Sequence, residues 1–336
     1  MRYCRKCGLP ENYPGICISE KDTCNYCDFF ESVREVWEDR EGRKRIFERE
    51  IEQAKKKAQE AGADYDCIVG LSGGKDSIYV VYELQKRYGM RVLTFTFDNG
   101  FTTEFGRRNV EVALGKLNAD HLTVRMREDE LRRQYQTCVN FLQNFCSVCF
   151  HFMHYYSHLL ARQYKIPLIV NGRTKGQILQ SALNQKGIEP FEISRNLKDF
   201  EYQMFGRLVE KLDARGKSDY LKDVEVTSLS YFAYHDVTDE EKMELLEKEL
   251  GWIRPASKVP HADCWAHPMA EYFSLKKRKF PVRTGELAVE VRMGNLSVEE
   301  AERMLDEDRI QYETPDWKLQ EQFYRRISPG RKREAC

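Results

Sequence analysis

The chain has 336 residues, and its 54 Lys and Arg residues balance 54 Asp and Glu residues, so the formal net charge is zero. A neutral chain lacks the strongly basic surface that is typical of proteins whose main partner is nucleic acid. No stretch approaches the roughly 20 apolar residues of a membrane span, and the N-terminus MRYCRKCGLP lacks the apolar segment of a signal peptide. We therefore expect a cytoplasmic protein with no membrane partner.

Two pairs of cysteines, each in a Cys-x-x-Cys motif, lie within the first 30 residues. They are Cys4, Cys7, Cys24 and Cys27. This spacing is typical of a structural zinc site, in which four thiolates close a tetrahedral shell around Zn²⁺. Because so short a segment buries little apolar surface, the metal would replace a core. We predict a separate zinc-binding module at 1–30, and the sequence leaves open whether Cys17 replaces one of the ligands.

A charged helical connector is expected at 31–63, and short apolar runs alternate with helix-length segments after it. The runs expected to be strands are 66–71, 92–97, 121–126 and 167–172. This alternation predicts an α/β fold, with a parallel sheet that is covered by helices on both faces. We expect this domain to occupy 64–230, followed by a helical C-terminal region at 231–315 and a charged, disordered tail at 316–336.

A glycine-rich loop, SGGKDS at 72–77, follows the first predicted strand and precedes a helical pattern. This arrangement directs backbone N–H groups and the positive end of a helix dipole at an anion. Gly73 and Gly74 allow a ligand to approach the backbone closely, and Lys75 adds a positive charge. The loop is not a Walker A motif, because Asp76 instead of Ser or Thr follows Lys75.

The loop resembles the pyrophosphate loop of the PP-loop ATP pyrophosphatase superfamily, whose fold is adenine nucleotide alpha hydrolase-like. Members adenylate a substrate oxygen, release pyrophosphate and let a nucleophile displace AMP. The resemblance implies that ATP binds at one set of loop and strand-end residues. They are Ser72, Gly73, Gly74, Lys75, Asp76, Ser77, Asp98 and Gly172.

Two of these predicted ATP-binding residues are aspartates. Asp98 would contact adenine and ribose, or it would cap the helix predicted from Glu104. A carboxylate beside two phosphates is costly unless a cation bridges them, so we interpret Asp76 as a Mg²⁺ ligand. Lys75 would offset the charge of the leaving pyrophosphate. Lys75 and Asp76 are therefore predicted to be catalytic.

Three further cysteines combine a Cys-x-x-Cys pair at the predicted start of a helix with one remote cysteine. They are Cys146, Cys149 and Cys264. Three thiolates are an incomplete zinc shell, but they suit a [4Fe–4S] cluster with one iron open. The alternatives are redox or persulfide thiols and buried cysteines with a structural role only. Three histidines share one face of the same helix, and we expect this face to line the substrate cleft or to contact solvent. They are His151, His154 and His158.

SGGKDS, the central CxxC, the late cysteine and the N-terminal zinc site together resemble the cluster-dependent tRNA thiolation enzymes of this superfamily. Most of the chain also resembles the N-acetyl sugar amidotransferases, in CRKCGLPENYPGICISEKDTCNYC, YDCIVGLSGGKDSIYVVY, LSYFAYHD and VEVRMGNLSVEEAERML. Those enzymes use ammonia from a partner glutaminase, and they keep one cysteine near position 146 without the CxxC. This departure favours sulfur.

The predicted reaction is ATP-dependent adenylation of a carbonyl or amide oxygen, followed by its replacement with sulfur held at Cys146, Cys149 and Cys264. The alternative is ammonia transfer to an N-acetyl sugar. The expected partners are a tRNA or a small sugar- or nucleotide-like substrate, and a sulfur donor or a glutaminase. We also expect a homo-oligomer.

Overall fold

The computed structural model describes residues 1–140, 145–178, 226–255 and 261–328. Its centre is a five-stranded sheet in the order β3-β2-β1-β4-β5, in which every neighbouring pair is parallel. The strands are β1 (Cys67–Gly70), β2 (Val92–Asp98), β3 (His121–Arg125), β4 (Leu168–Asn171) and β5 (Thr227–Ser230). The predicted α/β fold with a parallel sheet is confirmed.

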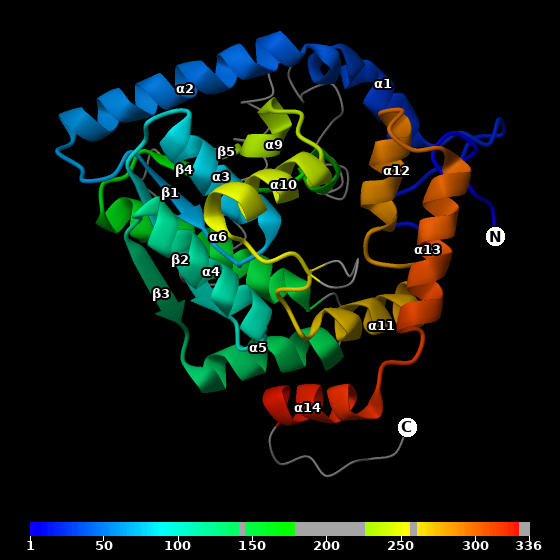
Figure 1. Ribbon diagram of the computed structural model, residues 1–336. Coiled ribbons are helices and arrows are strands. Elements are labelled where there is room, and N and C mark those ends of the chain that lie inside the picture. The colour runs from blue at the N-terminus through cyan, green and yellow to red at the C-terminus, as the bar shows by residue number, and fades with distance from the viewer. Residues whose placement is uncertain (141–144, 179–225, 256–260, 329–336) are drawn as a thin grey trace.

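Helices surround this sheet (Figure 1). In the first half of the chain they are α1 (Asn25–Glu38), α2 (Arg40–Glu60), α3 (Lys75–Lys86), α4 (Glu104–Leu117), α5 (Glu128–Asn140) and α6 (Cys146–Gln163). In the second half they are α9 (Tyr231–Tyr234), α10 (Asp239–Leu250), α11 (His267–Arg278), α12 (Thr284–Arg292), α13 (Val298–Tyr312) and α14 (Trp317–Ile327).

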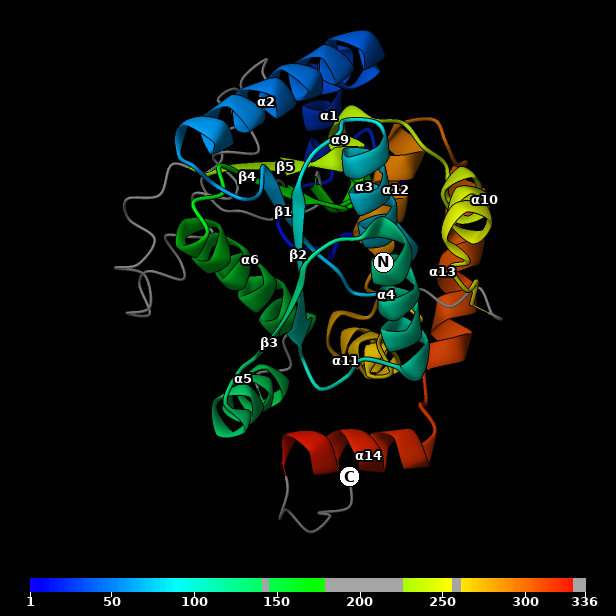
Figure 2. The same cartoon turned by 60° about the vertical axis from the view of Figure 1, so that its left-hand side comes forward.

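Both faces of the sheet are covered, which explains why the strands are continuous apolar runs. Cys67 and Val69 of β1 belong to the same buried cluster as side chains of α3 and α4. Ile68 points the other way and packs with Leu160 and Ala161 of α6. Figure 2 shows α3 and α4 on one side of the strands and α6 on the other.

The sheet domain continues past the predicted boundary at residue 230. Tyr231 of α9 and Leu246 of α10 are buried in the cluster that contains Val69 of β1. The helix α2 packs on the same region, where the rings of Phe47 and Tyr231 lie 5.4 Å apart. The apolar cluster of the sheet domain therefore includes α9 and α10. Residues 179–225, which fall within the predicted domain, lie outside the described residues.

The N-terminal module does not stand apart from the rest of the chain. The helix α1 begins inside the predicted 1–30 segment, and Figure 1 shows the module beside α12 and α13. The rings of Tyr13 and Phe280 lie 5.3 Å apart, and Asn12 Nδ2 donates to the backbone oxygen of Arg278 at 2.7 Å. The two ends of the chain thus form one packed region.

The tail predicted at 316–336 is not disordered over its first part, because Trp317–Ile327 form the helix α14. Phe323 and Ile327 are four residues apart, so they share one face of this helix, and both are buried. Gln136 of α5 donates to the backbone oxygen of Ile327 at 2.6 Å. Residues 329–336 lie outside the described residues. None of the helices in the described ranges combines the length and apolar character needed to cross a membrane.

Candidate functional site

The predicted phosphate loop connects the carboxyl end of β1 to the first turn of α3, and Gly74 is the N-cap of that helix. Gly73 has φ +91°, and a Cβ atom there would lie 2.1 Å from the backbone oxygen of Gly106. Glycine is therefore required at position 73 by both the backbone conformation and the neighbouring chain. The resulting loop presents the N–H groups of a helix start, which is a general anion-binding arrangement.

Side chains of the loop hold its shape. The Ser77 hydroxyl donates to the backbone oxygen of Gly74 at 3.2 Å and accepts from the N–H of Ser72 at 3.3 Å. The N–H of Gly74 donates to Ser72 Oγ at 3.3 Å. Trp252 Nε1 donates to the backbone oxygen of Gly73 at 3.2 Å. The loop is thus fixed from within and from the segment after α10.

Two lysines and two aspartates surround the loop. Lys75 Nζ lies 3.0 Å from Asp76 Oδ2 and 3.4 Å from Asp239 Oδ2. Lys242 Nζ lies 2.5 Å from Asp76 Oδ1 and 2.7 Å from Asp239 Oδ1. Burial opposes the charge of Lys75, but the two carboxylates outweigh it and raise the lysine pKa. Sequence reasoning missed Asp239 and Lys242, which come from α10.

This arrangement changes the argument for magnesium. The sequence predicts a cation at Asp76 because a carboxylate beside phosphates needs a counter-charge. In the structure two ammonium groups, those of Lys75 and Lys242, supply that charge. A Mg²⁺ ion at Asp76 stays a prediction. It is no longer required to balance the charge of this carboxylate, because the two lysines already do so.

Gly172 and Asp98 are the other two residues that are predicted to bind ATP, and only Gly172 lies beside the loop. Gly172 follows β4, and a Cβ atom there would lie 3.0 Å from the backbone carbonyl carbon of Asp76. Asp98 ends β2, accepts from the N–H of Gly100 at 3.0 Å and lies 3.4 Å from Arg125 Nε. It lines a separate cavity of about 440 Å³. Gly172 is therefore part of the loop surroundings, and the nucleotide role of Asp98 stays a prediction.

The alternative role of Asp98 as a helix cap is wrong. The N-cap of α4 is Thr103, whose hydroxyl accepts from the N–H of Gly106 at 3.0 Å. Threonine next to the first helical residue is a common cap, and this signal was present in the sequence.

A large cavity of about 1820 Å³ opens above the phosphate loop. The residues that line it include Gly74, Lys75, Asp76 and Ser77 from the loop and Gly172 from the end of β4. Cys149 of α6 lines the same cavity. The structure thus brings the predicted ATP site and one of the predicted cluster ligands to one space.

Cys146 and Cys264 pack against the same apolar cluster as Cys149. The segment before α11 pairs with the loop after β2, through a β-bridge between Thr102 and Cys264 and a 2.9 Å bond from the N–H of Thr103 to the backbone oxygen of Asp263. Burial raises the pKa of all three thiols, to about 12 for Cys264, and the proximity of Cys149 adds to the rise at the other two. The three predicted cluster ligands are therefore half-buried thiols in one region of the molecule.

Two polar side chains contact the sulfur of Cys149. Asn99 Nδ2 donates to Cys149 Sγ at 3.6 Å, and the Tyr135 hydroxyl lies 3.1 Å from the same atom. Hydrogen bonds to a ligand sulfur orient it and tune a bound metal centre. Tyr135 could not be predicted as part of the site, because its helix α5 meets α6 only in the folded chain.

The three helical histidines are less exposed than expected. His154 lines the large cavity, and burial lowers the pKa values of His154 and His158. The ring nitrogen Nδ1 of His151 donates to the backbone oxygen of Ser147 at 2.6 Å, and that of His158 donates to the backbone oxygen of His154 at 2.8 Å. Lowered pKa values keep both rings neutral, which suits a lining role for His154 and a packing role for His158.

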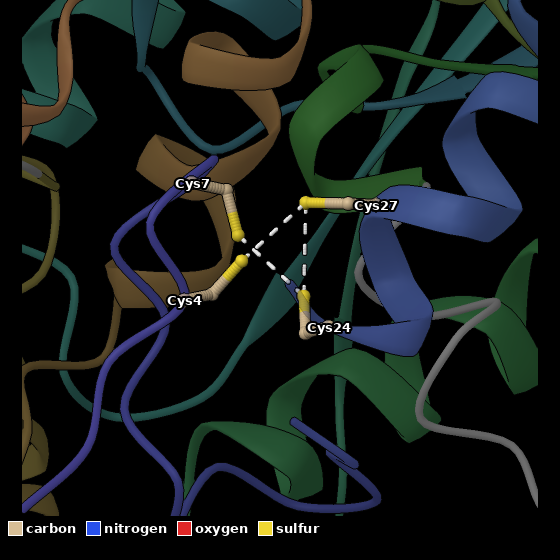
Figure 3. A group of neighbouring side chains, drawn as sticks. All are labelled: Cys4, Cys7, Cys24 and Cys27. Carbon is tan, nitrogen blue, oxygen red and sulfur yellow. Dashed lines mark hydrogen bonds between the residues drawn. The ribbon is translucent and has the colours of Figure 1, made fainter. Parts of the chain in front are cut away.

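The four N-terminal cysteines form a second centre (Figure 3). Cys4 and Cys7 come from the first turn of the chain, and Cys24 and Cys27 come from the start of α1, with all four sulfurs directed inward. The four sulfur atoms lie within 4.8 Å of one another, and all four residues are buried. Among the residues that the structure describes, these four cysteines form the one group of His, Cys, Asp or Glu side chains that is close enough together to bind a metal ion.

The donor set of this centre fits Zn²⁺. Hydrogen bonds among the thiols lower the pKa values of Cys4 and Cys24 and raise those of Cys7 and Cys27. A divalent cation that took all four as thiolates would leave a net negative shell. Arg292 of α12 is buried and donates to Cys7 Sγ at 3.0 Å, so a positive charge from the far end of the chain faces this shell.

Comparisons with known proteins add a set of distant structural likenesses. No protein-family model matches the chain, and neither does any curated protein. Among solved structures, the chain is similar to the U34-tRNA thiolase NcsA from Methanococcus maripaludis with its [4Fe-4S] cluster, at 17% identity and a TM-score of 0.37, over 91% of this chain and 88% of that one.

Two synthetases are also similar. NMN synthetase from Francisella tularensis matches at 15% identity and a TM-score of 0.32, over 65% of this chain and 88% of that one. NAD+ synthetase from Burkholderia pseudomallei matches at 14% identity and a TM-score of 0.34, over 81% of this chain and 96% of that one. Likenesses this distant carry no argument about function. The resemblance to PP-loop ATP pyrophosphatases therefore rests on the phosphate loop and the parallel sheet of this chain.

Proposed function

We propose that this chain is a PP-loop ATP pyrophosphatase that adenylates a carbonyl or amide oxygen of its substrate and then replaces that oxygen with sulfur. The observation that carries the proposal is the shared cavity, because Cys149 lines the same space as Lys75 and Ser77 of the loop. A substrate in this cavity would meet the nucleotide on one side and the cysteine site on the other.

The loop would act first. The N–H groups at the start of α3 would bind the β- and γ-phosphates of ATP, and Lys75 would offset the charge that develops on the departing pyrophosphate. The substrate oxygen attacks the α-phosphorus, and the bond from this phosphorus to the oxygen that bridges to the β-phosphate breaks. The adenylated oxygen later leaves with AMP when the nucleophile attacks the substrate carbon. Mg²⁺ at Asp76 would supply Lewis-acid assistance.

The cysteine trio would hold the group that provides sulfur. Cys146, Cys149 and Cys264 would offer three sulfurs from one region of the molecule, and Asn99 and Tyr135 contact the sulfur of Cys149. This donor set suits a [4Fe–4S] cluster with one iron free of protein ligands. When bound, it would present the sulfur that replaces the adenylated oxygen.

The test is to purify the full-length protein without oxygen and measure its visible absorbance and its iron and sulfide content. We expect about four irons per chain, with loss of iron in Cys146→Ala, Cys149→Ala and Cys264→Ala. Cys138→Ala is the matched control, because Cys138 is a half-buried cysteine on the neighbouring helix α5. ATP–pyrophosphate exchange, measured with the substrate, should survive in Cys146→Ala and disappear in Lys75→Met.

A colourless protein without iron would contradict sulfur transfer and favour the amidotransferase alternative. That outcome calls for a glutaminase partner and an N-acetyl sugar substrate, tested by incorporation of labelled ammonia. If iron is present, tRNA and small nucleotide-like compounds are the acceptors to test for uptake of labelled sulfur.

A further inference from the structure

A buried lysine from outside the loop takes part in the charge arrangement around it. Lys242 is 3% exposed, although lysine is almost never fully buried unless its charge is paired. Its Nζ lies between Asp76 and Asp239 and 4.4 Å from the centre of the Phe232 ring. It also lines the large cavity together with Lys75.

The position of Lys242 within its helix is unfavourable by itself. It is the fourth residue of α10, near the positive end of the helix dipole, where a cation is repelled. The helix has an independent cap, because the Thr238 hydroxyl accepts from the N–H of Glu241 and the Glu241 side chain accepts from the N–H of Thr238. The helix therefore does not need Lys242, and its ammonium group is held there by the two aspartates.

The four charges form a closed ring. Each aspartate uses one oxygen for Lys75 and the other for Lys242, so two positive and two negative charges cancel. If Lys242 lost its charge, two carboxylates would face Lys75 alone. The loop would then carry a net negative charge and would repel a polyanion.

We propose that Lys242 is a positioning residue for phosphate binding. By pairing with Asp76 and Asp239, it leaves Lys75 free to turn from these carboxylates to an incoming pyrophosphate group. The inference rests on the proposed role of the loop in ATP binding and adds a residue that acts through Lys75.

The test is calorimetric titration of the full-length protein with inorganic pyrophosphate in magnesium-free buffer. We expect Lys242→Met, which keeps an unbranched stem, to bind about tenfold more weakly or worse, and Lys242→Arg to retain most of the affinity. The matched control is Lys248→Met on the same helix, because Lys248 is 82% exposed and pairs only with its neighbour Glu249 among the described ion pairs. Lys248→Met should bind as the wild type does.

A compensating variant separates charge balance from a merely structural role. Adding Asp239→Asn to Lys242→Met removes one negative charge along with the positive one, and we expect it to restore most of the affinity. The side chain of Asp239 is 63% exposed, so the second change leaves the core intact. Failure of this double variant to recover, with an unchanged thermal unfolding temperature, would overturn the inference.

Lys75→Met distinguishes this inference from the proposed function. If Lys75→Met weakens pyrophosphate binding and Lys242→Met does not, the phosphate site stands and the role of Lys242 is wrong. If the wild type and Lys75→Met bind pyrophosphate equally, or neither binds it, the proposed function fails and the inference fails with it.

Discussion

Glu271 and His267 are a buried acid and a buried base, and burial shifts the pKa of each towards its neutral form. Glu271 Oε2 accepts from the N–H of Val282 at 2.8 Å, and its other oxygen lies 3.6 Å from His267 Nε2. Burial raises the pKa of Glu271 to about 7. Burial, with repulsion from His261 and Arg283, lowers the pKa of His267 to about 3. The histidine is therefore neutral across the physiological range, and the glutamate changes charge near pH 7.

We predict that Glu271→Gln becomes more stable relative to the wild type as the pH rises. The raised pKa means that folding favours the protonated acid, so this contribution is complete below about pH 4.5, the unfolded value, and is lost as the pH rises through about 7. The neutral amide has no such loss. The difference in unfolding free energy between the two proteins should grow by roughly 2–3 kcal/mol between pH 5 and pH 8.

Urea denaturation at pH 5, 6.5 and 8 measures this difference. Glu302→Gln is the control, because Glu302 is an exposed residue of α13. His267 acts in the opposite sense, since its lowered pKa costs stability that returns as the pH rises towards 6.5. Because His267 is present in both proteins, its contribution largely cancels in the comparison. A difference that did not change with pH would show that Glu271 is already ionised in the folded chain at pH 5.

The helix α14 closes the second apolar cluster of the molecule. Phe323 is fully buried there with Phe101, Phe145 and Phe273, and its ring stacks on that of Phe101 at 5.8 Å between centroids. We predict that Phe323→Ala lowers the free energy of unfolding by about 3–5 kcal/mol, because the cavity left behind adds to the lost burial.

The neighbouring residue Tyr324 provides the matched control for α14. Its side chain is 42% exposed, and Tyr324→Ala should therefore cost far less, about 0.5 kcal/mol. Chemical denaturation of both variants makes the comparison. Equal losses would mean that α14 contributes through its helical backbone and not through the buried ring.

Elements with strong local patterns could be predicted from the sequence, and elements that depend on distant partners could not. The apolar, partly β-branched runs became β1 to β4 within a residue or two of the expected limits. The strand β5, Thr227–Ser230, is a four-residue polar and apolar mixture that is buried by its pairing with β4. The charge of α14 suggested a tail, although the spacing of Phe323 and Ile327 already indicated a buried face.

In the candidate site, too, residues in local motifs could be predicted, and residues that come from distant parts of the chain could not. The loop and both cysteine groups are short motifs, so their residues could be named in advance. Lys242 contacts Asp76 from 166 positions away, and nothing in the charged pattern of α10 distinguishes it from the other lysines of that helix. The contact of Tyr135 with Cys149 likewise arises from the packing of α5 against α6.

At the scale of the whole molecule, the four-cysteine centre links the first and last parts of the chain. The buried cluster that contains the four cysteines also contains Phe280 and Ala288, and Arg292 reaches Cys7. We predict that Cys24→Ser loses the bound metal, which we propose to be zinc, and that the amides of α12 lose their protection from hydrogen exchange. The amides of β1 and β2, which belong to other clusters, should keep theirs.

Cys17→Ser is the control for this experiment, because Cys17 is exposed and lies outside the group of four sulfurs. It should retain one metal ion per chain and full protection of α12. If α12 stayed protected in a metal-free Cys24→Ser protein, the apolar contacts of Phe280 and Ala288 would be sufficient to hold the two ends together.

The contact between Cys7 and Arg292 joins two residues that are translated at different times. The two residues are 285 positions apart, so at ribosomal rates roughly 15–60 s separate their appearance. During that time the four-cysteine segment would already be able to bind a metal ion, since its four predicted ligands all lie between Cys4 and Cys27, but the helices that cover it have not yet been made. The four-cysteine segment is therefore translated well before the helices that it packs against, and a bound metal ion would preserve its shape until they are made.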